Sequence, residues 1–294
     1  MAVLLALLAA AAFALGTVLQ QKGTLETPAG EDDPRFLRQT LQRPAWLIGA
    51  GVQGAGWILQ AMALDRGSMV VVQSLCALSL VIALPLGARI TAQVVTRGVV
   101  LGAVALVVGI VVFLSLGTPS SGTSSPSSSD WWSAGLSTLV LIAVLGRVGQ
   151  RRHGSIRALS LGAAAGLSFA FQAAVTKAFV PLVGDGARAM LASWTVYVLI
   201  VSAVIGFVLQ QSALKTGVLA PALASSNAMT LLGSVLLGVT LFGETLSDGG
   251  SHTLAAVVGL LLAVVGIVAL ARGPAPDDAV ALPDAPAPRR VPAG

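Results

Sequence analysis

The stretch GWILQAMALDRG at residues 56–67 recurs as GFVLQQSALKTG at residues 206–217. The two stretches lie 150 positions apart and share six of their twelve residues. Other matches follow in the same order at offsets of 155 and 157: Lys22 with Lys177, Gly102 with Gly259, and the GIV of 109–111 with the GIV of 266–268. Ordered matches at a nearly constant offset indicate an internal duplication.

The composition around these matches is that of a membrane protein. The chain has 294 residues, of which 55% are hydrophobic and 10% charged, and its mean hydropathy is +0.89. A soluble domain has about 25% charged residues, so a cytosolic globular protein is excluded. A helix needs about 20 apolar residues to cross a bilayer. Apolar windows predict an all-α polytopic protein with nine transmembrane spans, at 2–19, 45–64, 68–87, 98–117, 131–146, 158–179, 190–210, 216–241 and 252–271.

The basic residues predict how the spans are oriented. Of 17 Lys and Arg residues, 14 fall on one side of the membrane, and only Arg66, Lys177 and Arg188 fall on the other. Because positive residues stay in the cytoplasm, the C-terminus is expected inside and the N-terminus outside. Trp131 and Trp132 are then expected at the outer interface. The excess of Arg over Lys and the abundant Ala favour a bacterial plasma (inner) membrane.

The spans and loops divide the chain into four parts. Long polar stretches with few apolar residues are expected to be unstructured, and here these are the linker at 118–130 and the tail. The parts are a first repeat at 1–117 with a cytoplasmic loop at 20–44, a segment at 118–157 with the Ser-rich external linker, the fifth helix and a basic cytoplasmic loop, a second repeat at 158–272, and a disordered cytoplasmic tail at 273–294.

The duplication predicts an inverted repeat. Spans one to four correspond to spans six to nine, so equivalent helices are five crossings apart and point in opposite directions. Secondary transporters are commonly built in this way, because two halves of opposite orientation can exchange inward-facing and outward-facing shapes around a central site. The sequence therefore favours a carrier that works by alternating access.

Three motifs resemble those of a known family. FALGTVLQQKG at 13–23 ends the first span, and GWILQAMALDRG and GFVLQQSALKTG lie within the repeats. Together they resemble the drug/metabolite transporter (DMT) superfamily, and the nine spans and the QQKG ending are most similar to its NIPA-like branch and the related EamA-type permeases. The resemblance covers about residues 2–271 and implies a substrate path between the two halves. Its NIPA-like members are described as magnesium transporters.

The acidic residues depart from the magnesium interpretation, because Mg²⁺ prefers carboxylate or water oxygens. None of the twelve Asp and Glu residues lies inside a predicted span, and they are Glu26, Glu31, Asp32, Asp33, Asp65, Asp130, Asp185, Glu244, Asp248, Asp277, Asp278 and Asp284. A buried carboxylate for proton coupling is therefore not expected. A magnesium path would have to use main-chain carbonyls near Pro221, and the sequence identifies no metal site.

Neutral polar residues within the spans are the candidates for a path, because polar groups in hydrocarbon must face other helices or a cavity. Interhelical hydrogen bonding is the alternative for each of them. We expect a helix break at Pro221, a gate or entrance at Gln60, Gln210 and Tyr197, and snorkelling of Lys22 and Lys177 to opposite faces. The predicted substrate path is lined by Gln53, Gln73, Gln172, Ser225, Ser226 and Asn227.

These residues suit a small neutral or zwitterionic metabolite, or a partly hydrated cation. A NIPA-like magnesium transporter and a non-transporting membrane scaffold are the alternatives. No catalytic or nucleotide-binding motif is present, so we expect no enzyme activity, no cofactor and no nucleic acid partner. The expected partners are the solute or ion and the lipid bilayer. The spacings Gly162-xxx-Gly166 and Ala50-xxx-Gly54 permit close helix contact, for which we favour one subunit over a homodimer.

Overall fold

The computed structural model describes residues 1–26, 39, 41–90, 95–120, 122, 126–214, 216, 219–246 and 250–271. Within these ranges the chain is helical and contains no strand. The elements are α1 (Ala2–Leu25), α3 (Pro44–Arg66), α4 (Met69–Ala77), α5 (Ser79–Ile90), α6 (Arg97–Gly117), α7 (Ser128–Arg151), α8 (Gly154–Phe179), the 3₁₀ helix η1 (Val180–Val183), α9 (Ala187–Ala192), α10 (Trp194–Leu214), α11 (Leu219–Phe242) and α12 (Gly250–Ala271).

Nine stretches of the described chain are long and apolar enough to cross a membrane, as the sequence predicted. The prediction of nine spans in an all-α protein is therefore confirmed. The seventh span begins at Trp194, not at 190, because Ser193 is extended and separates α10 from the short α9. The tail and most of the loop at 20–44 lie outside the described residues.

The Ser-rich linker is more ordered than predicted. Ser127 accepts a hydrogen bond from the backbone N–H of Asp130, and the Asp130 carboxylate accepts one from the N–H of Ser127. This capping box starts α7 inside the range expected to be unstructured. Ser120 also donates its N–H to the carbonyl of Thr245, 3.0 Å away. The prediction for 118–130 is therefore wrong at both ends of the range.

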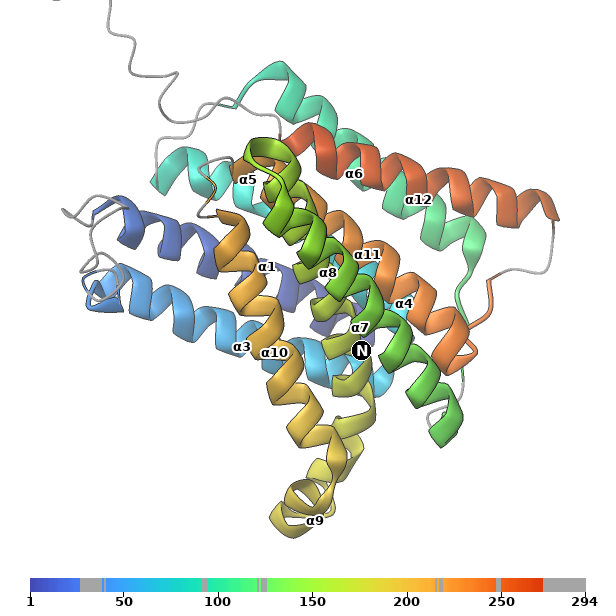
Figure 1. Cartoon of the computed structure of the whole chain (residues 1–294). Coiled ribbons are helices and arrows are strands. Elements are labelled where there is room, and N and C mark those ends of the chain that lie inside the picture. Colours follow the sequence, from blue (N-terminus) through green and yellow to red (C-terminus); the bar gives the residue numbers. More distant parts are fainter. Residues whose placement is uncertain are drawn as a thin grey trace, which may run out of the picture.

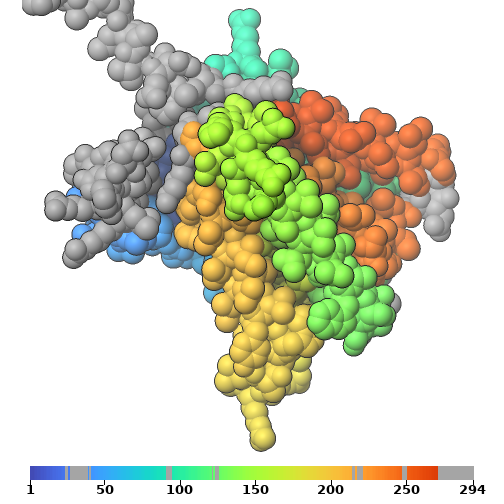
Figure 2. Space-filling model, viewed as in Figure 1, coloured from blue at the N-terminus to red at the C-terminus, as the bar shows by residue number. Residues whose placement is uncertain are grey.

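The helices pack in two groups and a pair. In Figure 1, α1 and α3 lie side by side, and α4 and α5 also pack against α1. In the second group α8 packs against α7, α10 and α11 and is the most buried span. The pair α6 and α12 lies along one edge, and α7 and α10 cover the face seen in Figure 2. The core forms where α4, α8 and α11 meet.

Glycines bring α6 and α12 into backbone contact. Gly102 lies against Gly266, and Gly109 lies against Gly259, so the two helices run antiparallel. Adding the repeat offset of 157 converts Gly102 to Gly259 and Gly109 to Gly266. The repeat that this offset predicts therefore relates the Gly102–Gly266 contact to the Gly109–Gly259 contact.

A second pair of contacts follows the repeat. The ring of Phe13 on α1 packs on Gly56 of α3, and the ring of Phe169 on α8 packs on Gly206 of α10. Gly56 and Gly206 are matched in the opening alignment, and Phe13 and Phe169 are 156 positions apart. The first helices of both halves thus contact the second helices through equivalent residues.

The third span is interrupted near its middle. Leu78 separates α4 from α5, and its N–H donates to the carbonyl of Leu75 in a tighter turn than an α-helix makes. Pro85 lies inside α5 and lacks the N–H that would bond to the preceding turn. The span therefore consists of two shorter helices with a junction at Leu78.

The tight α6–α12 contact predicts the effect of adding one methyl group. At Gly109 the new Cβ would lie 2.6 Å from the carbonyl oxygen of Gly259, and the backbone must shift to admit it. Gly109→Ala should lower the free energy of unfolding by about 1–3 kcal/mol, the usual range for overpacking. The measurement is denaturant unfolding of the purified protein in detergent. In the matched control Gly146→Ala on α7, the Cβ would have no neighbour within 4 Å, and stability should not fall. Equal losses in both variants would contradict this packing.

Candidate functional site

The first turn of α4 is held by a carboxylate from a distant part of the chain. Glu244 accepts hydrogen bonds from the backbone N–H groups of Met69 and Val70, at 2.5 and 2.9 Å. The hydroxyl of Ser68 accepts from the N–H of Val71, and the carbonyl of Ser68 accepts from that of Val72. The first four N–H groups of a helix have no partners within it. Here the N–H groups of Met69, Val70 and Val71 are satisfied by Glu244 and Ser68, which are both buried, and the N–H of Val72 makes the first bond within the helix.

A glycine turn delivers Glu244 to this position. The helix α11 ends at Phe242, and Gly243 follows with a φ of +61°, which a residue with a side chain rarely adopts. The N–H of Glu244 then bonds to the carbonyl of Gly238 at 3.0 Å. The chain reverses at the end of α11, and the carboxylate is directed back toward α4.

Lys177 supplies the opposite charge. Its Nζ lies 2.6 Å from Oε1 of Glu244, and the side chains are 11% and 0% exposed. The ammonium group also lies 4.8 Å from the centre of the Phe242 ring, an arrangement that favours the cation. Lys177 therefore does not snorkel to the surface, and that prediction is wrong. Lys22 instead makes an exposed ion pair with Glu26, at 3.8 Å.

A cluster of aromatic rings includes Phe242, the ring beside Lys177. The indole of Trp131 makes edge-to-face contacts with Phe171, Trp194 and Phe242, at centroid distances of 6.3, 5.1 and 6.1 Å. Trp131 is thus packed within the bundle, whereas its neighbour Trp132 is 79% exposed. The placement of both indoles at the outer membrane interface remains a prediction. The side chain of Glu244 is fully buried and that of Lys177 nearly so, and this exclusion of water strengthens the attraction between the two charges.

Two predicted residues meet one turn further along α4. Gln60 on α3 donates its side-chain N–H to Oε1 of Gln73 on α4, at 3.0 Å. Gln73 is 4% exposed, and its own Nε2 is a buried donor without a hydrogen-bond partner in the described structure. The carbonyl oxygens of Gln53 and Gln210 are likewise buried acceptors without partners there. These amides are the groups with which a solute could form hydrogen bonds.

The predicted residues on α11 bond mainly within their own helix. The Ser225 hydroxyl donates to the carbonyl of Pro221, and the Asn227 amide donates to that of Leu223, both at 2.8 Å. Ser226 is buried, and its carbonyl accepts a hydrogen bond from Thr230. The helix break predicted at Pro221 is not present. Pro221 is the third residue of α11, where a missing N–H leaves no intrahelical bond unmade.

Of the two small-residue spacings, one makes the predicted close helix contact and the other does not. Gly162 and Gly166 on α8 pack against the backbone of Ala222 and Ser226 on α11, within one subunit, as expected. Gly54 has no neighbour within 4 Å of the position of a Cβ. Its helix instead approaches α1 through Gly49, which lies against Gly16.

The remaining predicted residues lie apart from the Gln60–Gln73 pair. Gln172 on α8 is half-buried, and its backbone carbonyl accepts a hydrogen bond from Thr176. Tyr197 on α10 is 58% exposed and donates its hydroxyl to the carbonyl of Leu191. It lines a cavity of about 260 Å³ between α7, α8 and α10.

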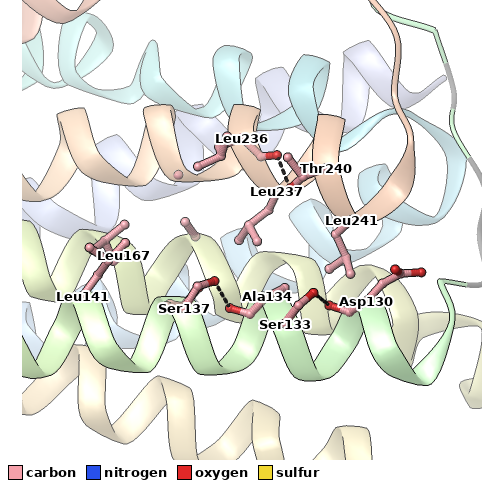
Figure 3. A pocket seen from close by; sticks show the side chains of 13 residues that line it. Asp130, Ser133, Ala134, Ser137, Leu141, Leu167, Leu236, Leu237, Thr240 and Leu241 are labelled. Carbon is pink, nitrogen blue, oxygen red and sulfur yellow. Dashed lines mark hydrogen bonds between the residues drawn. The ribbon is translucent and has the colours of Figure 1, made fainter.

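A larger cavity, of about 370 Å³, lies between α7, α8 and α11 (Figure 3). Most of its lining is apolar. Its hydroxyl groups bond to their own helices: Ser133 donates to the carbonyl of Asp130, Ser137 to that of Ala134, and Thr240 to that of Leu236. The cavity therefore offers a solute few free donors and suits an apolar occupant such as an acyl chain. None of the predicted path residues lines it.

The described residues contain no group of three His, Cys, Asp or Glu side chains that could hold a metal ion. Glu244 is the buried carboxylate among them, and it is already bonded to Lys177 and to two backbone N–H groups. A divalent ion would have to displace the Lys177 ammonium group to reach it.

The fold and these buried contacts define a multi-pass, all-α membrane protein. The chain is 31% identical over 277 residues to an uncharacterized protein of Corynebacterium glutamicum. The match covers 92% of this chain and 95% of the relative, so the two proteins belong to the same family. No protein-family model matches the chain, and no solved structure matches it.

The buried ion pair predicts non-additive effects on stability. Lys177→Met leaves the Glu244 carboxylate buried without its counter-charge and should lower the free energy of unfolding by roughly 3–5 kcal/mol. The double variant Lys177→Met with Glu244→Gln should lose less than Lys177→Met alone, because Gln is neutral and its carbonyl oxygen can still accept a hydrogen bond from α4. Denaturant unfolding of both variants and of Glu244→Gln completes the cycle. Additive losses would mean that the two charges are not coupled.

Proposed function

We propose that this protein is a secondary transporter of the DMT superfamily, close to its EamA-type and NIPA-like members, which moves a small solute by alternating access between two inverted repeats. The observation that carries the proposal is the exchange of glycine contacts between α6 and α12. Gly102–Gly266 and Gly259–Gly109 are interchanged by the repeat offset of 157, in helices that run antiparallel. A two-fold axis in the membrane plane produces this pattern.

The packing of the other helices agrees with such an axis. The contacts Phe13–Gly56 and Phe169–Gly206 are related by the repeat, and α1 packs against α3 as α8 packs against α10. Halves related by inverted symmetry can adopt each other's conformation, which opens a central site first to one side and then to the other. This property supports transport over a static scaffold.

The solute path is proposed to pass the Gln60–Gln73 pair. The Gln73 Nε2 is buried without a partner in the described structure, which is costly in a bundle that lies in hydrocarbon. A solute that accepts a hydrogen bond relieves this cost. Gln53, Gln172, Ser225 and Asn227 remain proposed further members of the path. Because these groups are uncharged, the favoured solute is a neutral or zwitterionic metabolite.

The orientation follows from the charges. The ends of α3, α8 and α11 near Glu244 are followed by few basic residues, whereas Arg147, Arg151, Arg152 and Arg157 surround the turn between α7 and α8. We assign the Glu244 side to the exterior and the arginine-rich side to the cytoplasm of a bacterial cell.

Uptake into proteoliposomes tests the proposal. Purified protein is first heated with a panel of amino acids, small neutral metabolites and MgCl₂, because a bound solute raises the melting temperature. Any stabilising solute is then supplied in labelled form, and its uptake is compared with that of empty vesicles. Gln73→Leu should lower uptake at least tenfold, which corresponds to the loss of about 1.4 kcal/mol of solute binding.

The matched control is Gln150→Leu, on the exposed surface of α7, which should leave uptake unchanged. Saturable uptake of Mg²⁺ alone would show that the solute is magnesium and not a metabolite, and it would still support a transport function. No uptake of any solute by folded protein would contradict transport and favour the scaffold.

A further inference from the structure

The buried contacts around Glu244 are confined to one end of the bundle. At this end the carboxylate joins three helices: α11, which it follows, α4, whose first two N–H groups it binds, and α8, which carries Lys177. The helices α4 and α11 belong to different proposed repeats. The contact therefore crosses the boundary between the halves that an alternating-access transporter separates.

The repeat-related connection in the first half carries no carboxylate in its sequence. It follows the span that corresponds to α11, runs over residues 91–96 and contains no Asp or Glu. The repeat-related lysine, Lys22, is exposed and pairs with Glu26, the residue that follows its own helix. The two halves are thus related in packing but differ in this one interaction.

The half-helix α4 is suited to move when the contact is released. It has nine residues and is separated from α5 at Leu78, and element ends of this kind absorb changes of backbone angle in hinge motions. Its Gln73 lies one turn beyond Met69, on the same side of the helix. Displacement of α4 would open the way to Gln73 from the Glu244 end.

We propose that Glu244 and Lys177 form a latch that closes the Glu244 end of the transport path, and that the resting protein is closed at this end. The proposal rests on the transport function proposed above. Opening breaks the bonds from Glu244 to Met69 and Val70 and swings α4 about Leu78. Because these contacts stabilise the conformation closed at the Glu244 end, loss of the carboxylate shifts the population toward the conformation open at that end.

The native cysteine reports this opening without any substrate. Cys76 is the single cysteine of the chain, lies on α4 and is 7% exposed. Its labelling by a membrane-impermeant maleimide should be slow in the wild-type protein from the Glu244 end. In Glu244→Gln, and in the double variant with Lys177→Met, the labelling rate should rise at least tenfold. Cys76→Ser gives the background.

Two further variants make the test specific. Lys22→Met removes the repeat-related lysine and should leave the rate unchanged. Gly238→Ala keeps both charges, but its Cβ would lie 2.9 Å from Oε2 of Glu244 and displaces the carboxylate, so it should also raise the rate. Gly238→Ala still tests the latch if the charge variants fail to fold, and melting temperatures show whether they fold.

The side of labelling is fixed separately. Thr245→Cys in the Cys76→Ser background places an exposed thiol at the Glu244 end, and its labelling in intact cells or in inside-out vesicles shows which membrane face to use. An unchanged Cys76 rate in folded latch variants, or an equal rise in Lys22→Met, would overturn the latch. Neither result depends on solute uptake, so failure of the latch and failure of transport remain distinguishable.

Discussion

The backbone N–H groups of Met69, Val70 and Val71 at the start of α4 must find partners inside an apolar bundle, and the contact among three spans depends on how this requirement is met. An unsatisfied N–H in hydrocarbon costs several kcal/mol. The hydroxyl of Ser68 supplies one acceptor, and Glu244 supplies the other two from just beyond the end of α11. The carboxylate in turn requires a cation, which Lys177 provides from α8. The hydrogen-bonding requirement of one short helix thereby connects three spans.

The contact joins α4, α8 and α11 at one end of the bundle. Glycine seams hold α6 to α12 and α8 to α11 along their lengths, and such seams depend on close backbone approach rather than on charge. The Glu244 contact differs because it is polar, local and confined to one end. Its removal changes the free energy of one conformation without changing the seams, and this is the property required of a gate.

The nine spans could be predicted from the sequence because apolar length determines them, and an internal duplication could be proposed because residues recur in order at offsets of 150 to 157. Glu244 could not be identified as a buried residue, since it follows its span and has the appearance of a loop residue. Two signals pointed to it: Lys177 in an apolar helix needs a counter-charge, and Gly243 marks a helix end that turns back. The hydrogen-bond partner of Asn227 could not be predicted either, because an amide side chain in a helix can bond to the backbone of its own helix. Pro221 was misjudged because the start of α11 was placed three residues too early.

We infer that the two proposed repeats separate at the Glu244 end when the latch is broken. Spin labels at Asp65→Cys and Thr245→Cys, two exposed positions beside the latch, report this separation in a Cys76→Ser background. Distances between the labels can be measured by pulsed electron paramagnetic resonance in lipid bilayers, with Glu244 intact and with Glu244→Gln. The account predicts one short distance in the first protein and an additional longer distance in the second. The same single distance in both proteins would contradict it.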